Sequence, residues 1–156
     1  LNAVDSVVDL GCGDWAWMQY VNRSGARYLG LDVVSSVISR NQSHFAGPDV
    51  SFKMAPRDRQ DLPRADLLIM KDVMQHMPND EVRGYLQDVV PKYRWALITN
   101  SFRKIDPKYK VNSDITYGDF RPIDLTAEPF GASGTYVYEH SSFAHEQIRT
   151  LLLTSA

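Results

Sequence analysis

The sequence predicts an α/β protein in which helices cover both faces of a mostly parallel β-sheet. Apolar runs typical of strands alternate along the chain with stretches typical of helices, a pattern that favours parallel strands joined by helices. The apolar runs are also continuous, with no alternation of apolar and polar residues, as expected of strands buried on both faces. The length of 156 residues fits one domain with a real core, so we expect residues 1–156 to form a single domain.

Each expected strand coincides with one short apolar run. The strands are predicted near Ser6–Leu10, Arg27–Asp32, Val50–Met54, Asp66–Met70 and Trp95–Asn100. Helices are predicted between them, near Trp15–Arg23, Ser36–Phe45 and Asp80–Val90.

The third helix has the clearest signals. Asn79 is a good N-cap residue, and Asp80 and Glu81 suit the positive end of a helix. The apolar residues that follow recur at the spacing of a core-facing stripe: Val82, Tyr85, Leu86, Val89 and Val90. Pro91 is expected to end this helix.

The C-terminal third of the chain has a different character. Residues 101–134 show no sustained period and are interrupted by several prolines and glycines. A segment of that length without regular structure is uncommon in a compact domain unless it is a lid or a binding loop, so we expect a substrate loop here. Two β-rich runs follow it, at Thr135–His140 and Gln147–Thr154.

The most informative motif joins the first two predicted strands. Val7-Val8-Asp9-Leu10-Gly11-Cys12-Gly13-Asp14-Trp15 is typical of a buried strand, a glycine turn and a helix start. Asp32 ends the second apolar run, about 20 residues after the turn. This arrangement is that of a Rossmann-like sheet that holds a nucleoside cofactor, with the carboxylate placed for the ribose diol.

Two cofactors compete for this pattern. A dinucleotide needs a glycine turn that faces a pyrophosphate, and Gly11-x-Gly13-x-x-Ala16 matches that motif weakly. The carboxylate of Asp9, at the strand end, is poorly placed beside a negatively charged pyrophosphate. It is well placed beside the cationic amino group of a methionine moiety. The stretch resembles the first motif of the class I S-adenosylmethionine (SAM)-dependent methyltransferases, a hydrophobic strand that runs into D/E-x-G-x-G.

A second stretch resembles the same family. Residues 65–76, Ala-Asp-Leu-Leu-Ile-Met-Lys-Asp-Val-Met-Gln-His, are similar to the family's fourth strand and the residues after it, and the resemblance extends over nearly the whole chain. In this class the sheet ends in an antiparallel pair. The resemblance therefore implies a three-layer sandwich with strand order 3-2-1-4-5-7-6, in which strand 7 is antiparallel.

The resemblance also implies which residues meet the cofactor, SAM, and its product S-adenosylhomocysteine (SAH). Asp32 would accept the ribose hydroxyls, Val33 would lie against the adenine, and Asp58 matches the position that meets the adenine amino group. Lys71, Asp72 and Val73 would lie beside the methionine part. The remaining expected contacts come from the glycine turn: Asp9, Gly11, Cys12, Gly13 and Trp15. Trp15 stands where many relatives have a third glycine, so it either covers the cofactor or packs under the first helix.

His76 is the first candidate for a general base. It follows the fourth strand, and the unperturbed pKa of histidine is near neutrality. A structural or substrate-positioning role for His76 is the alternative. His140 and His145 flank the final turn and are expected to be exposed to solvent.

Substrate contacts are expected in the loop that follows the fifth strand. Its stretch Asn112 to Leu125 mixes carboxylates, an arginine and aromatic residues, and it is similar to an N-D-I…G-x-[YF]-R-P-[IL]-D-L pattern of some bacterial-type methyltransferase domains. Asp114, Tyr117 and Arg121 are the predicted contacts, and Arg121 suits an anionic acceptor. The alternative is that Arg121 fastens the loop by pairing with a nearby aspartate.

Composition and charge limit the kinds of partner that the protein is expected to bind. The formal net charge of −2 gives no electrostatic case for nucleic acid, and no run approaches the roughly 18 to 20 apolar residues of a membrane span. The single cysteine, Cys12, mildly favours a reducing compartment, so a cytoplasmic location is expected, and no metal site is predicted. The chain has almost nothing before the first strand, where relatives carry a helix, so that helix is expected to be missing from the given sequence.

Three functions remain at this stage. The leading one is a methyltransferase that transfers the SAM methyl group to an oxygen or nitrogen of a small molecule by in-line displacement. The second is a degenerate SAM-binding domain with a regulatory or scaffold role. The third, disfavoured by Asp9 and by the tract from Lys71 to His76, is an NAD-dependent oxidoreductase.

Overall fold

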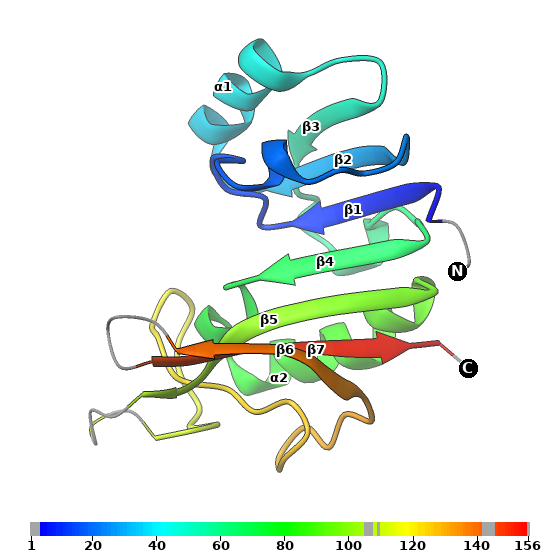
Figure 1. The fold of residues 1–156 in the computed structure, drawn as a ribbon. Coiled ribbons are helices and arrows are strands. Elements are labelled where there is room, and N and C mark those ends of the chain that lie inside the picture. Colours follow the sequence, from blue (N-terminus) through cyan, green and yellow to red (C-terminus); the bar gives the residue numbers. More distant parts are fainter. Residues whose placement is uncertain (1–3, 105–107, 109, 142–145, 156) are drawn as a thin grey trace.

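Seven strands form one sheet in the computed structural model, which describes residues 4–104, 108, 110–141 and 146–155. The strands are β1 (Ser6–Leu10), β2 (Arg27–Asp32), β3 (Val50–Met54), β4 (Leu67–Lys71), β5 (Trp95–Lys104), β6 (Thr135–Ser141) and β7 (Glu146–Thr154). Their order is β3-β2-β1-β4-β5-β7-β6 (Figure 1). Neighbours from β3 to β5 are parallel, and β7 is antiparallel to both β5 and β6. The predicted strand order and the reversed seventh strand are therefore confirmed.

β1 lies in the middle of the parallel part of the sheet. Val7 is opposite Tyr28 of β2 on one side and Leu67 of β4 on the other. Because these strands run in one direction, β1, β2 and β4 end at the same edge, on the left in Figure 1. This edge brings the glycine turn and the residues after β2 and β4 together.

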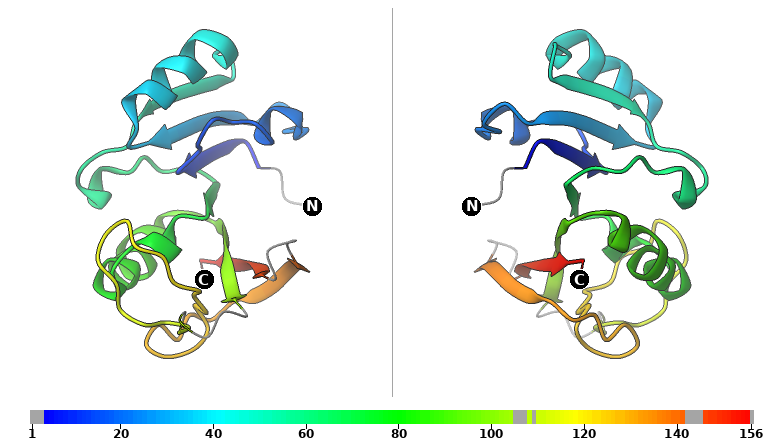
Figure 2. Two further views of the ribbon diagram at one scale, coloured as in Figure 1. Left: turned by 90° about the vertical axis from the view of Figure 1, so that its left-hand side faces the viewer. Right: turned by 90° about the vertical axis from the view of Figure 1, so that its right-hand side faces the viewer.

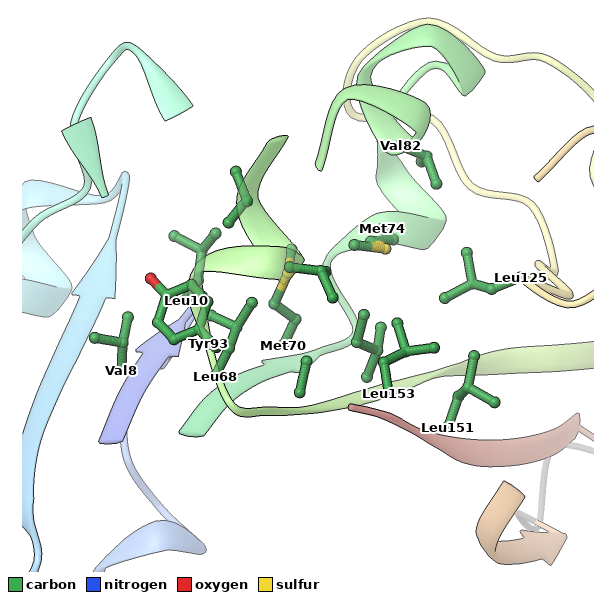
Figure 3. Packing of buried hydrophobic residues seen from close by; sticks show 14 of the residues in the cluster. Val8, Leu10, Leu68, Met70, Met74, Val82, Tyr93, Leu125, Leu151 and Leu153 are labelled. Atoms are coloured by element: carbon green, nitrogen blue, oxygen red, sulfur yellow. The ribbon is translucent and has the colours of Figure 1, made fainter. Parts of the chain in front are cut away.

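The larger part of the core lies on the face of the sheet that carries α2 (Asn79–Gly84). Figure 3 shows Val8, Leu68 and Met70 of the sheet pointing toward this core, with Met74 and Val82 above them. Leu68, Met70, Met74 and Val82 have no exposed surface. Complete burial of such side chains contributes about 1.5–3 kcal/mol each, so this packing holds the β4–α2 connection firmly to the sheet.

A smaller cluster lies on the opposite face, under α1 (Ser35–Phe45). Trp15 is at its centre, with its ring 5.6 Å from Tyr28, 5.0 Å from Phe45 and 5.3 Å from Phe52. Of the 11 residues of α1, only Ile38 and Asn41 are buried. The helix therefore contacts the sheet along one narrow stripe.

The predicted helix Trp15–Arg23 is wrong. The structure has a single 3₁₀ turn at Met18–Tyr20 in its place. Trp15 has φ of +59°, a left-handed conformation that an α-helix cannot include, and its side chain is buried in the aromatic cluster. Packing of the Trp15 ring thus determines the backbone conformation here and overrides the helical preference of the residues that follow.

The predicted helix Asp80–Val90 forms with three differences. The α-helical part ends at Gly84, and the stripe continues as a wider π-helical segment, Tyr85–Val89, and a 3₁₀ turn, Val90–Lys92. Pro91 stands in the first turn of that 3₁₀ segment, where a missing N–H is tolerated. Asn79 is the first helical residue and not the cap; its backbone N–H donates to the Asp114 carboxylate at 2.8 Å. A side chain from the distant loop therefore caps the helix.

The long segment before β6 is irregular in its described part, as predicted, although β5 extends to Lys104 before it begins. Figure 2 shows this segment, yellow to orange, passing beside α2. Ile123 and Leu125 anchor it by entering the main core. None of the helices in the described residues has the length and apolar character needed to cross a membrane.

Candidate functional site

A cleft of about 1070 Å³ opens at the sheet edge where β1, β2 and β4 end. Its walls come from the glycine turn, the ends of β2 and β3, the segment after β4, and single residues of α2 and the long loop. The lining residues are Leu10, Gly11, Asp32, Val33, Met54, Ala55, Pro56, Arg57, Asp58, Arg59, Asp72, Val73, His76, Met77, Glu81, Tyr85 and Tyr117. A cleft of this size at this edge fits the usual place of a ligand in open α/β sheets.

The glycine turn lies against the floor of the cleft, and its first glycine has no room for a side chain. Gly11 has φ of +79°, and a Cβ atom there would lie 2.4 Å from Cγ2 of Val73. The N–H groups of Gly11 and Cys12 both donate to the Leu31 carbonyl, at 2.8 and 3.0 Å. β1 and β2 are thus joined at the turn, and only glycine fits at its first position.

Asp32 connects this turn to the end of β2. One carboxylate oxygen accepts from the Gly13 N–H at 3.0 Å, and the other accepts from the Val34 N–H at 2.9 Å. Each carboxylate oxygen can accept more than one hydrogen bond, so both keep acceptor capacity toward the cleft. The half-buried Asp32 side chain is therefore fixed in direction and still able to bind hydroxyl groups. Val33 beside it is exposed and offers an apolar surface in the same cleft.

Asp58 and Arg59 form the wall that follows β3. Asp58 caps a short 3₁₀ turn by accepting from the Gln60 N–H at 2.8 Å. Arg59 donates to Asp88 at 2.9 Å and lies 3.6 Å from Glu81, so it ties this wall to α2 and the π-helical segment. Asp58, a predicted site residue, lies in the cleft as an exposed side chain.

The residues after β4 divide between the two faces of the sheet. Asp72 lines the cleft, has φ of +59°, and forms an ion pair with Lys71. Val73 lines it as well and fills the space above Gly11. Lys71 does not line the cleft; its side chain faces an apolar groove of about 630 Å³ on the α1 face of the sheet.

His76 enters the cleft with a fixed ring orientation. Its Nδ1 is 2.8 Å from the Asp119 carbonyl oxygen. Because a carbonyl oxygen can only accept, Nδ1 carries the proton of the neutral ring and Nε2 holds a lone pair. The Phe120 ring lies 5.8 Å from the imidazole. In this tautomer Nε2 has the lone pair, and it accepts a long 3.5 Å hydrogen bond from the Gln75 side-chain amide.

A segment of the long loop, residues 112–121, wraps around residues 74–79; we call it the clamp. The Gly118 N–H donates to the His76 carbonyl at 3.0 Å, and the Arg121 N–H donates to the Gln75 carbonyl at 3.2 Å. The Arg121 side chain, 1 % exposed, donates to the carbonyls of Met74 and Met77 and to the Asn79 side chain. The clamp therefore holds the backbone on both sides of His76.

The three predicted substrate residues have different positions in the clamp. Tyr117 lines the cleft and is exposed, and partial burial together with the nearby Glu81 carboxylate raises its pKa. Asp114 caps α2 from outside the cleft. Arg121 is buried under the cleft wall and is a structural fastening, although its partners are carbonyls and an amide and not the aspartates considered from the sequence. We carry only Tyr117 forward as a candidate substrate contact.

Several predicted cofactor residues lie behind the glycine turn and not in the cleft. Asp9 is 2 % exposed and accepts a hydrogen bond from the Tyr28 hydroxyl at 2.6 Å; burial raises its pKa to about 6. Burial and the charges of Asp9 and Asp32 raise the pKa of the Cys12 thiol to about 12, so it is no nucleophile at neutral pH. Trp15 packs in the core, the second of the two alternatives left open by the sequence. The side chains of Asp9, Cys12 and Trp15 support the turn from below.

The sequence alone did not point to two residues of the cleft, or to one residue that supports the glycine turn from behind. Glu81 and Tyr85 belong to the core-facing helix, and their place beside Tyr117 depends on where the clamp crosses α2. Asn41 of α1, fully buried, donates to the Gly13 carbonyl at 2.8 Å. A polar residue in the buried stripe of a helix was the one signal that pointed to it. Among the described residues, no group of three or more His, Cys, Asp or Glu side chains is arranged to hold a metal ion.

Comparison with known proteins identifies a family whose model matches this sequence. The model of a family described as methyltransferase domain matches residues 7–91. No curated protein matches the sequence. Solved structures match over nearly the whole chain, at low identity.

The N-terminal domain of EvdMO1, crystallised in the presence of SAH and D-fucose, has a TM-score of 0.71 at 14% identity; the match covers 98% of this chain and 77% of that one. Magnesium protoporphyrin IX methyltransferase from Synechocystis PCC 6803, with bound SAH, has a TM-score of 0.66 at 16% identity, over 96% and 74%. The methyltransferase domain of bacterial CtHen1 has a TM-score of 0.64 at 15% identity, over 97% and 91%. At these identities the likeness concerns the fold.

Proposed function

This chain belongs to the class I SAM-dependent methyltransferase family, and on that premise we propose that it transfers the SAM methyl group to an oxygen or nitrogen of a small-molecule acceptor. The observation that carries the proposal is that one cleft contains Asp32 and Gly11 of the glycine turn together with His76 and Tyr117. A nucleoside end and a reactive end then share one cavity, as a two-substrate transfer requires.

The cofactor end has the features that SAM needs. Asp32 is fixed by two backbone N–H groups and keeps acceptor capacity for the ribose diol. Gly11 lets Val73 pack directly on the turn, and Val33 and Asp58 are available to an adenine ring. When bound, SAM supplies a methyl group on a positively charged sulfur, which an acceptor takes up in one in-line displacement. The protein's task is then to hold and orient two reactants, an effect that can lower the barrier by about 7–11 kcal/mol.

The acceptor end contains a base of defined tautomer. Nδ1 of His76 donates to the Asp119 carbonyl, which leaves the lone pair on Nε2. We propose that Nε2 accepts the proton that an acceptor hydroxyl or ammonium group must lose. A general base of this kind contributes typically about 10²- to 10⁴-fold to the rate. Tyr117 and Tyr85 stand on the rim and would contact the body of the acceptor.

The charges around the cleft support a small molecule over a nucleic acid. Four carboxylates line it, from Asp32, Asp58, Asp72 and Glu81, against two guanidinium groups, from Arg57 and Arg59. Such a surface repels a phosphate backbone. We also propose a cytoplasmic location, because the one cysteine is a free, buried thiol.

Calorimetric titration of the purified chain with SAM, SAH and NAD tests the cofactor. We expect micromolar binding of SAM and SAH and none of NAD. Asp32→Asn should weaken SAM about 10- to 100-fold, because hydrogen bonds to a charged group contribute about 1.5–3 kcal/mol. Asp49→Asn is the matched control, since Asp49 is an exposed aspartate just before β3, at the opposite edge of the sheet. Binding of NAD alone, or equal SAM affinity in both variants, would contradict the proposal.

A screen of hydroxylated and amine acceptors with SAM that carries a labelled methyl group tests the transfer. With an acceptor in hand, His76→Gln should lower kcat by about 10²-fold or more and leave the SAM affinity unchanged. His44→Gln is the control, because His44 is exposed on α1 outside the cleft. Turnover by His76→Gln that equals wild type across the pH range would remove His76 from the role of base.

A further inference from the structure

Asn41 is an unusual residue in its helix. The residues of α1 are mostly polar and exposed, and only Ile38 and Asn41, three positions apart, are buried. Asn41 has no exposed surface. An aliphatic side chain would pack at such a position without the cost of burying an amide, which amounts to about 1–3 kcal/mol for a group left without a partner. The amide therefore needs a partner that explains it.

That partner is the glycine turn. Nδ2 of Asn41 donates to the Gly13 carbonyl at 2.8 Å, and Cys12 Sγ lies 4.0 Å away. The Asn41 Oδ1 atom is buried without a partner among the described residues. The side chain thus makes one strong hydrogen bond, and it makes it to the backbone of the turn.

Gly13 is held from both sides. Its N–H donates to the Asp32 carboxylate at 3.0 Å, and its carbonyl accepts from Asn41. A Cβ atom at Gly13 would meet nothing within 4 Å, so no side-chain packing restrains this residue. Glycine is also the residue with the largest backbone freedom. These two hydrogen bonds, with a long 3.7 Å one from the Cys12 thiol to the same carbonyl, are therefore the restraints that fix the peptide groups around Gly13.

We infer that Asn41 is a positioning residue for the cofactor: it holds the Gly13 carbonyl so that the glycine turn keeps the shape that SAM requires. The inference rests on the proposed function. It connects α1, which does not line the cleft, to the affinity of the cofactor end through one hydrogen bond. Loss of this bond leaves the Gly13 carbonyl with only the long 3.7 Å hydrogen bond from the Cys12 thiol, and therefore less firmly held.

Asn41→Leu removes the donor and keeps the volume. We expect SAM and SAH to bind about tenfold more weakly, the equivalent of one hydrogen bond of about 1–1.5 kcal/mol. Two variants of the same helix are controls. Ile38→Ala removes buried apolar contact from the same stripe, and Gln42→Met removes a side-chain donor whose acceptor is the Phe52 carbonyl of β3 at 2.9 Å. Both should lower the thermal midpoint and leave the SAM affinity within about twofold of wild type.

Asn41→Asp provides a readout that a packing role would not move. The ionised carboxylate has no proton to donate and repels the Gly13 carbonyl, whereas the protonated form donates as the amide does. SAM binding to this variant should therefore be weak at pH 8 and recover as the pH falls. Asp9 and Asp32 are the titratable carboxyls near the turn, so the wild-type affinity is measured over the same pH series and divided out.

Amide hydrogen exchange in the unliganded protein separates this inference from the proposed function. We expect faster exchange at residues 11–15 in Asn41→Leu and not in Ile38→Ala or Gln42→Met. Unchanged exchange and unchanged SAM affinity in Asn41→Leu would overturn the inference even if wild type binds SAM. Faster exchange in a protein that binds neither SAM nor SAH would contradict the proposed function and, with it, the link from Asn41 to the cofactor.

Discussion

Gly11→Ala tests the geometry of the turn quantitatively. The backbone at Gly11 has φ of +79°, where an L-residue costs about 1–2 kcal/mol. The new methyl group would also lie 2.4 Å from Val73 Cγ2, and relief of such overpacking costs typically about 1–3 kcal/mol. The free energy of unfolding should therefore fall by about 2–5 kcal/mol. SAM affinity should fall too, because Val73 and Gly11 both line the cleft.

Gly13→Ala is the matched comparison. It has a similar backbone conformation, with φ of +54°, but nothing lies within 4 Å of its Cβ position. Only the backbone cost of about 1–2 kcal/mol applies there. The gain from restricting the unfolded chain is common to both substitutions, so it cancels in their difference. That difference, about 1–3 kcal/mol, measures the contact with Val73 alone.

Val73→Ala supplies the second half of a double-mutant cycle. Removing the two methyl groups should relieve the clash, so Gly11→Ala and Val73→Ala should couple favourably by about 1–3 kcal/mol. Gly13→Ala and Val73→Ala should be additive within about 0.5 kcal/mol. Urea unfolding of the three single and two double variants, with SAM titration of each, gives both numbers. Equal costs at the two glycines, or no coupling with Val73, would refute the argument from the close approach.

Three further outcomes follow from the buried polar groups. Arg121→Met should lower the free energy of unfolding by about 3 kcal/mol, measured by urea titration, because it leaves buried carbonyls without donors; a loss below about 0.5 kcal/mol would mean that the clamp is dispensable. Burial raises the pKa of Asp9 from 3.8 to about 6, so the folded state binds more protons than the unfolded state between those values and stability falls as the pH rises through them. Asp9→Asn should therefore be as stable as wild type near pH 3 and more stable, by up to about 3 kcal/mol, above pH 7, since a tenfold change in proton affinity is about 1.4 kcal/mol; a difference that does not depend on pH would contradict this. Tyr28→Phe removes the hydroxyl that donates to Asp9, so the pKa of Asp9, followed by carboxyl NMR, should rise further, and a fall would contradict the assigned hydrogen bond.

The strands could be predicted from the sequence because burial on both faces leaves a direct mark. Continuous apolar runs gave the bounds of β1 and β2 as the structure has them. The predicted bounds of β3 agree as well, although β3 is an edge strand in which only Phe52 is buried, and those of the other strands agree to within a few residues. The helix expected at Trp15–Arg23 could not be excluded in this way. Its fate depends on Trp15, whose ring packs against Phe45 and Phe52, residues far along the chain. Local patterns carry no record of such contacts.

In the candidate site, too, some residues could be predicted from local patterns and others could not. Gly11, Asp32 and His76 follow strand ends, and parallel strands end at one edge, so their place could be deduced before the structure. Arg121 could not be placed, because an arginine in a polar loop gives no sign that its guanidinium will be buried under the chain at Met74 and Met77. The same holds for Asn41, whose partner is a backbone carbonyl 28 positions away.

The clamp has a consequence for protein engineering. Its anchors, Asn112 to Asp114 and Gly118 to Arg121, make the hydrogen bonds that fix residues 74–79, whereas Tyr117 between them is 67% exposed and lines the cleft. The residues that hold the segment in place and the residue that lines the cleft are thus at different positions of one short segment. A library that varies residues 115–117 and keeps the anchors would diversify the acceptor end while the glycine turn and Asp32, on other segments, stay as they are. We expect acceptor preference in this domain to be exchangeable by substitution of a few loop residues, without a new cofactor site.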